Sequence, residues 1–444
     1  MTPGPVGNLM HVGSSDRGRR AAKERARARH AQRMTDGVDA RSLDANGLAA
    51  RLWAAANDYS YGQRQVAAAE ATALGDADDR QLGLAVAGVF HRTLNLLWPS
   101  GWLPYDLVQV IRRECDDFAT ALVTDVIAVD MSQHAEATLH ERWRDQLRQI
   151  EARPWWPHDR QHFEQWLTRH ILTKVEGLEV VIVALATLMT LPKLPLILPL
   201  PGTSTAADAA TAVVVDQKVL AKVRGLLAKA ESTEFPEEAE ALSAKAQELM
   251  TRHAFERALL DADEHVPQTA SSRRVWLDTP YVGAKAQLVA AVAAANRSRG
   301  VVYEKIGFIA LIGADLDLEI TELLSTSLLL QATRAMVAAG TSTASGIEAR
   351  SRTYRQSFLL AYATRIGQRL RAAAQESDDL VSDDRLLPVL ADREHAVEQL
   401  FEELYPSTVK KSYTVGSAAG WEAGTAAADL ADIGVSRQKL TPTR

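Results

Sequence analysis

Apolar residues recur three and four positions apart through much of the first half of the chain, which is the repeat of one helix face. One such stripe covers residues 82–97 and a second covers 107–127. Between them, residues 98–106 contain two prolines, a glycine and two tryptophans, so the chain must turn there. We therefore predict an all-helical domain over residues 46–191, with the tryptophans anchoring the turn in its core.

Two further segments follow this domain. Residues 192–215 are rich in Pro, Ala and Thr and have no hydrophobic period, which is typical of a linker. Residues 216–256 then return to helical spacing twice, and Asp216 is a good N-cap for the first helix. We predict an αα-hairpin over 216–256, in which acidic side chains complement the start of the second helix and His253 packs on the apolar seam.

The pattern changes once more after residue 273. A helical stretch over 281–296 precedes two short apolar runs at 300–304 and 308–313, which are typical of strands. A longer helix then begins at Asp315 or Asp317. We predict an α+β domain over residues 273–435 with a small antiparallel sheet, and a chain that is mainly α overall.

Composition narrows the class of protein. The 444 residues are 47% hydrophobic and 24% charged, with a formal net charge of −6, so bulk charge does not favour nucleic-acid binding. The single cysteine, Cys115, allows no internal disulfide and fits a cytoplasmic location. Residues 180–200 are apolar but interrupted by prolines. They favour a buried helix running into the linker, and a membrane span is the weaker alternative.

Positive charge is concentrated at the N-terminus. Residues 1–45 are predicted to be a disordered basic tail, either solubilising or in contact with nucleic acid. The candidate contacts in the tail are Arg19, Arg20, Lys23, Arg25 and Arg27.

A second group of arginines lies on a helix in the predicted α+β domain. Arg352, Arg355, Arg365 and Arg369 flank an apolar stripe. The planar guanidinium group of arginine is well suited to phosphate, yet any amphipathic helix also needs a charged outer face. The pattern is thus compatible with a phosphate-contacting surface and with a solvated face.

One histidine cluster resembles a metal site. His158 and His162 stand four positions apart, as on one face of a zinc-peptidase helix, with His170 downstream. Asp159 occupies the position of the catalytic glutamate, and neighbouring tryptophans equally favour core packing. Apart from this weak candidate we expect no cofactor, because no phosphate loop, dinucleotide fingerprint or nucleophile motif is present.

The predicted hairpin also resembles a known family. The stretches KVRGLLAKAEST at 222–233, PEEAEA at 236–241 and KAQELM at 245–250, followed by His253, resemble the domain-of-unknown-function family DUF2786 in order and spacing. The 98–106 turn and the segment after the hairpin resemble actinobacterial members more loosely. Because the family has no assigned activity, the resemblance implies a fold element and not a reaction.

Two functions are compatible with these patterns. The first is a non-enzymatic cytoplasmic interaction protein with a nucleic-acid or protein partner, in which the basic tail and the arginine helix contact nucleic acid. The alternative is a metal-dependent hydrolase that uses His158 and His162. A membrane partner is not expected, and the sequence does not predict an oligomeric state.

Overall fold

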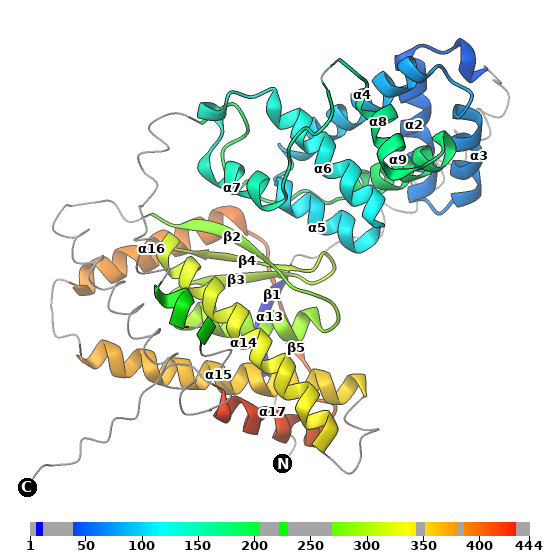
Figure 1. Cartoon of the computed structure of the whole chain (residues 1–444). Helices are drawn as coiled ribbons and strands as arrows, with labels where there is room; N and C mark the ends of the chain where they lie inside the picture. The colour runs from blue at the N-terminus through cyan, green and yellow to red at the C-terminus, as the bar shows by residue number, and fades with distance from the viewer. Residues whose placement is uncertain are drawn as a thin grey trace, which may run out of the picture. The chain divides into compact units, whose positions relative to one another are not determined.

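The computed structural model describes residues 6–11, 39–157, 159–204, 222–226, 228–229, 269–342, 351–380 and 386–431. The chain divides into two compact units (Figure 1). The helical unit is Ser14–Ala212, and the α+β unit combines Met1–Gly13 with Val213–Arg444. The predictions of a mainly α protein and of a small antiparallel sheet are confirmed.

The helical unit consists of short and medium helices joined by tight turns. Its elements are η1 (Ala40–Ser42), α2 (Ala45–Ser60), α3 (Arg64–Leu74), α4 (Asp79–Leu97), α5 (Pro104–Glu114), α6 (Asp117–Ser132), η2 (Glu136–Thr138), α7 (Glu141–Gln149), α8 (His162–His170) and α9 (Lys174–Met189). Asp44, Asp78 and Asp116 cap the helices that follow them by accepting from first-turn N–H groups. Short polar caps at these positions explain where the helices begin.

Tryptophans tie the segment after α9 to this unit. The indole N–H of Trp102 donates to the carbonyl of Pro192 at 2.9 Å, and that of Trp143 donates to Pro199 at 3.0 Å. Gly101 lies in the turn with φ +83°, and a Cβ there would come 2.4 Å from the carbonyl oxygen of Leu194. The first part of the predicted linker, 192–204, therefore packs on the helical unit. No helix within the described ranges has both the length and the apolarity needed to cross a membrane.

The α+β unit contains a five-stranded sheet in the order β2-β4-β3-β1-β5. Its strands are β1 (Val6–His11), β2 (Ser271–Trp276), β3 (Arg299–Tyr303), β4 (Phe308–Gly313) and β5 (Val409–Tyr413). The central pairs β2–β4 and β3–β4 are antiparallel, whereas β1 runs parallel to β3 and antiparallel to β5.

Strand β1 corrects one prediction. Residues 6–11 fall in the range assigned from the sequence to a disordered tail, yet they pair with β3, with Met10 opposite Val301. The segment is short and contains Gly7 and Asn8, which weaken any strand pattern. Its pairing partners lie hundreds of positions away in the chain, so no local pattern reveals it.

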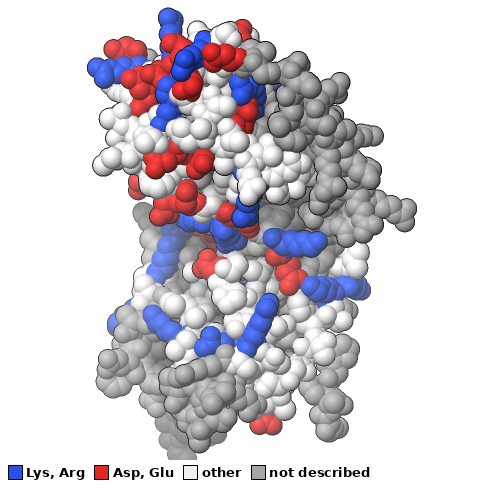
Figure 2. Space-filling view, turned by 90° about the vertical axis from the view of Figure 1, so that its right-hand side faces the viewer, with Lys and Arg blue, Asp and Glu red and all other residues white. Residues whose placement is uncertain are grey.

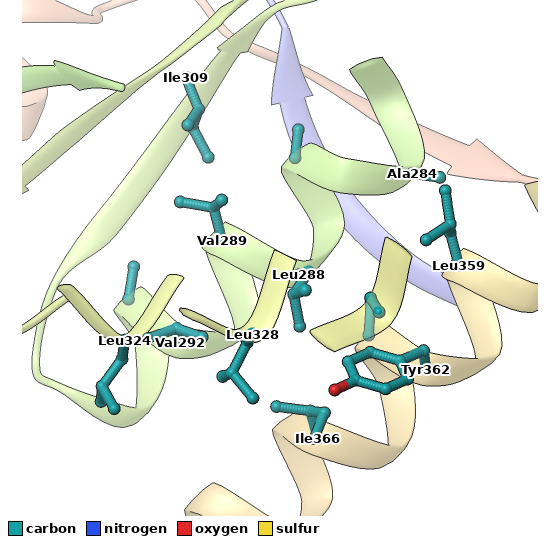
Figure 3. Close-up of a cluster of buried hydrophobic side chains, with 14 of the residues drawn as sticks. Ala284, Leu288, Val289, Val292, Ile309, Leu324, Leu328, Leu359, Tyr362 and Ile366 are labelled. Carbon is teal, nitrogen blue, oxygen red and sulfur yellow. The ribbon is translucent and has the colours of Figure 1, made fainter. Parts of the chain in front are cut away.

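Among the described residues of this unit, five helices follow strand β2. They are α13 (Val282–Ala295), α14 (Asp315–Ser342), α15 (Arg352–Leu380), α16 (Leu386–Leu404) and α17 (Ala418–Leu430). Figure 3 shows the core between α13, α14 and α15, where Leu328 of α14 and Ile366 of α15 point toward one another and Val289 of α13 faces Ile309 of β4.

Both faces of β4 are covered. Ile309 and Leu311 belong to the core that contains α13, while Tyr303, on the opposite face of the neighbouring β3, contacts Tyr405 just beyond α16 with ring centroids 6.5 Å apart. All six residues of β4 are buried. A strand buried on both faces is continuously apolar, which explains why this run was recognisable in the sequence.

Candidate functional site

Two of the four candidate arginines on α15 are used inside the unit. Arg365 forms an ion pair with Asp429 of α17, and Arg369 donates to the carbonyl oxygens of Ala428 and Ala431 at the end of that helix. Carbonyls in the last turn of a helix lack intrahelical donors, and a guanidinium group satisfies them well. These two side chains therefore join α15 to α17.

The other two arginines lie at the start of α15. Arg352 is exposed and Arg355 is partly buried. The loop after β5 packs on this end of the helix, because the backbone N–H groups of Gly416 and Ser417 donate to the Ser357 hydroxyl at 3.2 and 3.1 Å. A Cβ on Gly416 would also come within 2.5 Å of Thr353. The chain that leaves strand β5 thus contacts Thr353 and Ser357 in the first turns of α15, next to Arg352 in the sequence.

Strand β5 is an edge strand and carries two consecutive exposed lysines, Lys410 and Lys411. Lys411 forms an ion pair with Glu304, and exposed Lys305 follows Glu304 in the β3–β4 turn. We call Lys305, Lys410, Lys411 and Arg352 the β5 surface. Figure 2 shows Lys and Arg side chains spread over this unit with few acidic ones between them, while the helical unit shows both signs interspersed.

The buried Tyr413 of strand β5 contacts Glu304, the ion-pair partner of Lys411. The Tyr413 side chain is 7% exposed, and its hydroxyl donates to Glu304 Oε2 at 3.4 Å. Burial raises the pKa of Tyr413, and the neighbouring Glu304 raises it further, so the phenol stays protonated and remains a donor. Lys411 pairs with Glu304, so these two charges compensate each other, and the four cations of the β5 surface outnumber this one carboxylate.

The five candidate residues of the basic tail, Arg19, Arg20, Lys23, Arg25 and Arg27, lie outside the described residues. Their contact with nucleic acid stays a prediction.

The histidine candidates occupy different surroundings. His162 begins α8, and its Nε2 lies 2.9 Å from Asp125 Oδ2, with the Trp156 ring centroid 4.1 Å from its own. His170 ends α8 against Phe118 and Trp166. Burial lowers the pKa of His170, and the adjacent Arg169 lowers it further. The imidazole is thus neutral at pH 7.

His158 lies outside the described residues. Within the described part of the chain, no three His, Cys, Asp or Glu side chains come together as metal ligands would. The metal site of His158, His162 and His170 therefore stays an untested prediction.

The sequence pattern did not reveal the acids that hold these histidines. On α6, Asp125 accepts from Trp155 Nε1 at 2.8 Å as well as pairing with His162. Five positions on, Asp130 repeats the arrangement with Trp98 Nε1 at 2.8 Å and His91 Nδ1 at 2.7 Å. Partners 30 or more positions away complete both networks, so only the fold brings them together.

The first helix of the predicted hairpin is described in part. Residues 222–226 and 228–229 are helical, and the remainder of the predicted hairpin at 216–256, including His253, lies outside the described residues. Residues 218–257 match the family "Protein of unknown function (DUF2786)". The resemblance is confirmed for this segment, and no curated protein and no solved structure gave a significant match to the chain.

The described part of the DUF2786 segment packs on the α+β unit. Val223 is fully buried in the core shared by α13, α14 and α15, and Leu226 packs against the same core. Arg224 forms an ion pair with Glu319 of α14 at 3.0 Å. Burial raises the pKa of Glu319, whereas Arg273 and Arg224 oppose that shift. In the described residues, Val223 and Leu226 and the Arg224–Glu319 ion pair anchor the DUF2786 helix on this unit.

Proposed function

We propose that this protein is a non-enzymatic nucleic-acid accessory of the cytoplasm that contacts the sugar–phosphate backbone through the β5 surface. The observation that carries the proposal is the exposed Lys410 on the edge strand β5. Its neighbour Lys411 points to the opposite face of the sheet and pairs with Glu304, which precedes exposed Lys305. Arg352 is exposed at the start of α15, the helix that the chain after β5 contacts. Two or more cations at one edge of a sheet offer a track for successive phosphates. Lysines on edge strands also prevent pairing with other chains, and the variants below distinguish the two roles by their effect on nucleic-acid binding.

Local charge overrides net charge in this interpretation. The chain has a formal net charge of −6, yet the four cations of the β5 surface and Glu304, which pairs with Lys411, together carry three positive charges in excess (four minus one). At physiological ionic strength the Debye length is about 8 Å, so a phosphate at this surface experiences mainly the nearby lysines and arginine. The basic tail, with its five candidate cations, would add a second contact region.

The test is binding of the full chain to fluorescein-labelled double-stranded DNA and single-stranded RNA, followed by fluorescence anisotropy as a function of salt. Lys410→Glu combined with Arg352→Glu is expected to weaken binding at least tenfold. It should also reduce the magnitude of the salt slope by about 0.9 per lost phosphate contact on duplex DNA. Both side chains are exposed, and a glutamate at the start of α15 complements the helix dipole, so folding should be preserved.

The matched control carries the same change of net charge on the helical unit. Arg80→Glu with Lys193→Glu alters two exposed side chains there and should leave binding within twofold of the wild type. Equal loss in both double variants would reduce the effect to net charge and contradict a defined surface. Absence of binding to either nucleic acid at 50 mM salt would end the proposal.

The tail needs a design that spares strand β1. Deleting the N-terminus would remove residues 6–11 from the sheet and confuse binding with folding. Replacing Arg19, Arg20, Lys23, Arg25 and Arg27 by glutamine keeps that strand. If the tail adds phosphate contacts, this variant loses affinity and salt dependence together, whereas a purely solubilising tail leaves both unchanged.

A further inference from the structure

The helical unit contains a pocket of about 670 Å³ between α6, the loop after α7 and the end of α8. Six of the side chains that line it are Asp125, Arg148, Arg153, Trp155, Arg169 and His170. Sites for small molecules commonly have volumes of about 300–1,000 Å³, so a metabolite-sized molecule would fit. All of these residues belong to one unit, so the pocket does not depend on how the two units are arranged.

Three arginines converge on this pocket, and they differ in their partners. Arg148 is paired with Asp145 on its own helix. Arg169 lies over the Trp155 ring, 4.2 Å from its centroid, which orients the guanidinium group without neutralising it. Among the described residues, neither Arg153 nor Arg169 has an acidic partner. Two cations with unused donors face one cavity, which is the arrangement that bidentate recognition of an oxyanion requires.

Two acidic side chains, Asp125 and Glu151, also line the pocket, so a ligand there meets acceptors as well as cations. Asp125 Oδ2 already accepts from Trp155 at 2.8 Å and lies 2.9 Å from His162 Nε2, so the network fixes its position. Its other oxygen receives no hydrogen bond from the described residues and can accept one from a ligand. His170 is held neutral by burial and by Arg169, so it can exchange hydrogen bonds without adding charge.

We propose that this pocket binds a small organic phosphate, with the phosphoryl oxygens on Arg153 and Arg169 and a hydroxyl or amine of the ligand on Asp125. The half-exposed indole of Trp155 supplies an apolar wall beside the phosphate position. An oxyanion alone would leave the Asp125 acceptor and most of the volume unused. The chemistry therefore points to a phosphomonoester that carries hydrogen-bond donors, such as a sugar phosphate or a nucleoside monophosphate.

Isothermal titration calorimetry on the full chain tests this with four probes: inorganic phosphate, ribose 5-phosphate, adenosine monophosphate and adenosine. At least one of the two phosphomonoesters is expected to bind at least tenfold more tightly than inorganic phosphate and than adenosine. The rank of the two separates a sugar phosphate from a nucleotide ligand. Phosphate binding as strong as that of both esters, or no binding of either ester at millimolar concentration, would overturn the proposal.

Variants locate the site. Arg153→Gln and Arg169→Gln, alone and together, alter exposed side chains and should each weaken binding of the preferred ester, with the double variant at least tenfold weaker. Arg160→Gln, an exposed arginine outside the pocket lining, is the matched control and should change the affinity less than twofold. Unchanged binding in the double variant would refute the site. The nucleic-acid affinity of that variant should equal the wild type, because the β5 surface lies on the other unit.

Discussion

The two units differ in how the chain builds them. The helical unit is one continuous stretch, Ser14–Ala212, whereas the α+β unit takes strand β1 from the N-terminus and every other element from residues beyond 212. In the helical unit, two buried carboxylates organise polar networks: Asp125 and Asp130 each accept from an indole and pair with a histidine. In the α+β unit, Gly420 and Gly424 of α17 let its backbone approach the backbone of α15 closely. We therefore expect substitutions at the buried carboxylates to destabilise the helical unit and substitutions at the α17 glycines to destabilise the α+β unit, each without affecting the other.

The largest effect is expected where α15 and α17 meet. A Cβ on Gly420 would lie 2.5 Å from the Tyr354 carbonyl oxygen, and one on Gly424 would lie 2.2 Å from that of Phe358. Backbone cannot move aside cheaply, so replacing both glycines by alanine should destabilise the α+β unit by about 3 kcal/mol or more. Urea denaturation with hydrogen exchange resolved by mass spectrometry would localise the loss.

Gly88 on α4 provides the matched control for this pair. It is an exposed helical glycine with open space around its Cβ position. Gly88→Ala should stabilise the helical unit by about 0.5–1 kcal/mol, because alanine restricts the unfolded chain and favours helix. If the Gly420 and Gly424 variant were as stable as the wild type, tight contact between α15 and α17 would not be what holds that unit.

A smaller loss is expected from the buried carboxylate of Asp130 in the helical unit. Its side chain is 4% exposed and serves Trp98 and His91. Asp130→Ala leaves a buried indole N–H without an acceptor, which should cost about 2 kcal/mol. Asp76→Ala, which removes an exposed ion pair with Arg41, should change the free energy of unfolding by less than about 0.5 kcal/mol. If Asp130→Ala and Asp76→Ala lowered the free energy of unfolding equally, burial of the Asp130 network would not be what stabilises the helical unit.

The arginines of α15 sharpen the contrast further. Arg369 satisfies two carbonyls at the end of α17, so Arg369→Gln should destabilise the α+β unit by about 1 kcal/mol. Arg352 is exposed at the start of the helix, and Arg352→Gln should leave the stability unchanged within about 0.5 kcal/mol. We would measure the unfolding free energy by urea titration and the DNA affinity of both variants. Arg369→Gln should lose more stability, and Arg352→Gln should lose more DNA affinity.

The sequence predicted those helices and strands whose hydrophobic spacing is visible within the segment itself. The helices between 46 and 191 follow from apolar spacing, and β4 follows from its unbroken apolar run. Strand β1 was missed because its partners, β3 and β5, are far away in sequence. Only tertiary contact makes such a short segment extended.

The candidate sites were harder for the same reason. Arg365 and Arg369 follow the spacing of a solvated helix face, and nothing nearby in sequence shows that α17 covers them. Asp125 looks like an ordinary polar position in α6 until the fold places Trp155 and His162 beside it. Two adjacent lysines, Lys410 and Lys411, are too short a charge run to be recognised in the sequence. Only the fold shows that they lie on an edge strand of the sheet.

The smallest expected effect is a difference in pH dependence between the units. Burial raises the pKa of Asp317 in α14, against the opposing influence of Arg393 and Arg297. The folded α+β unit therefore binds a proton more tightly than the unfolded chain does. The stabilisation is complete below the unfolded pKa of 3.8 and is lost as pH rises through the folded value. Asp317→Asn should consequently be more stable than the wild type at pH 7.5, and this advantage should shrink on acidification.

His170 in the helical unit gives the opposite sign. Its folded pKa is lowered mainly by burial and then by Arg169, so its contribution is present above the unfolded pKa of 6.5 and is lost as pH falls. His170→Gln removes this dependence, and its stability relative to the wild type should rise from pH 7.5 to pH 5. Unfolding free energies of both variants over that range should therefore change in opposite directions. Parallel changes would contradict the view that the two units bury their titrating groups in different ways.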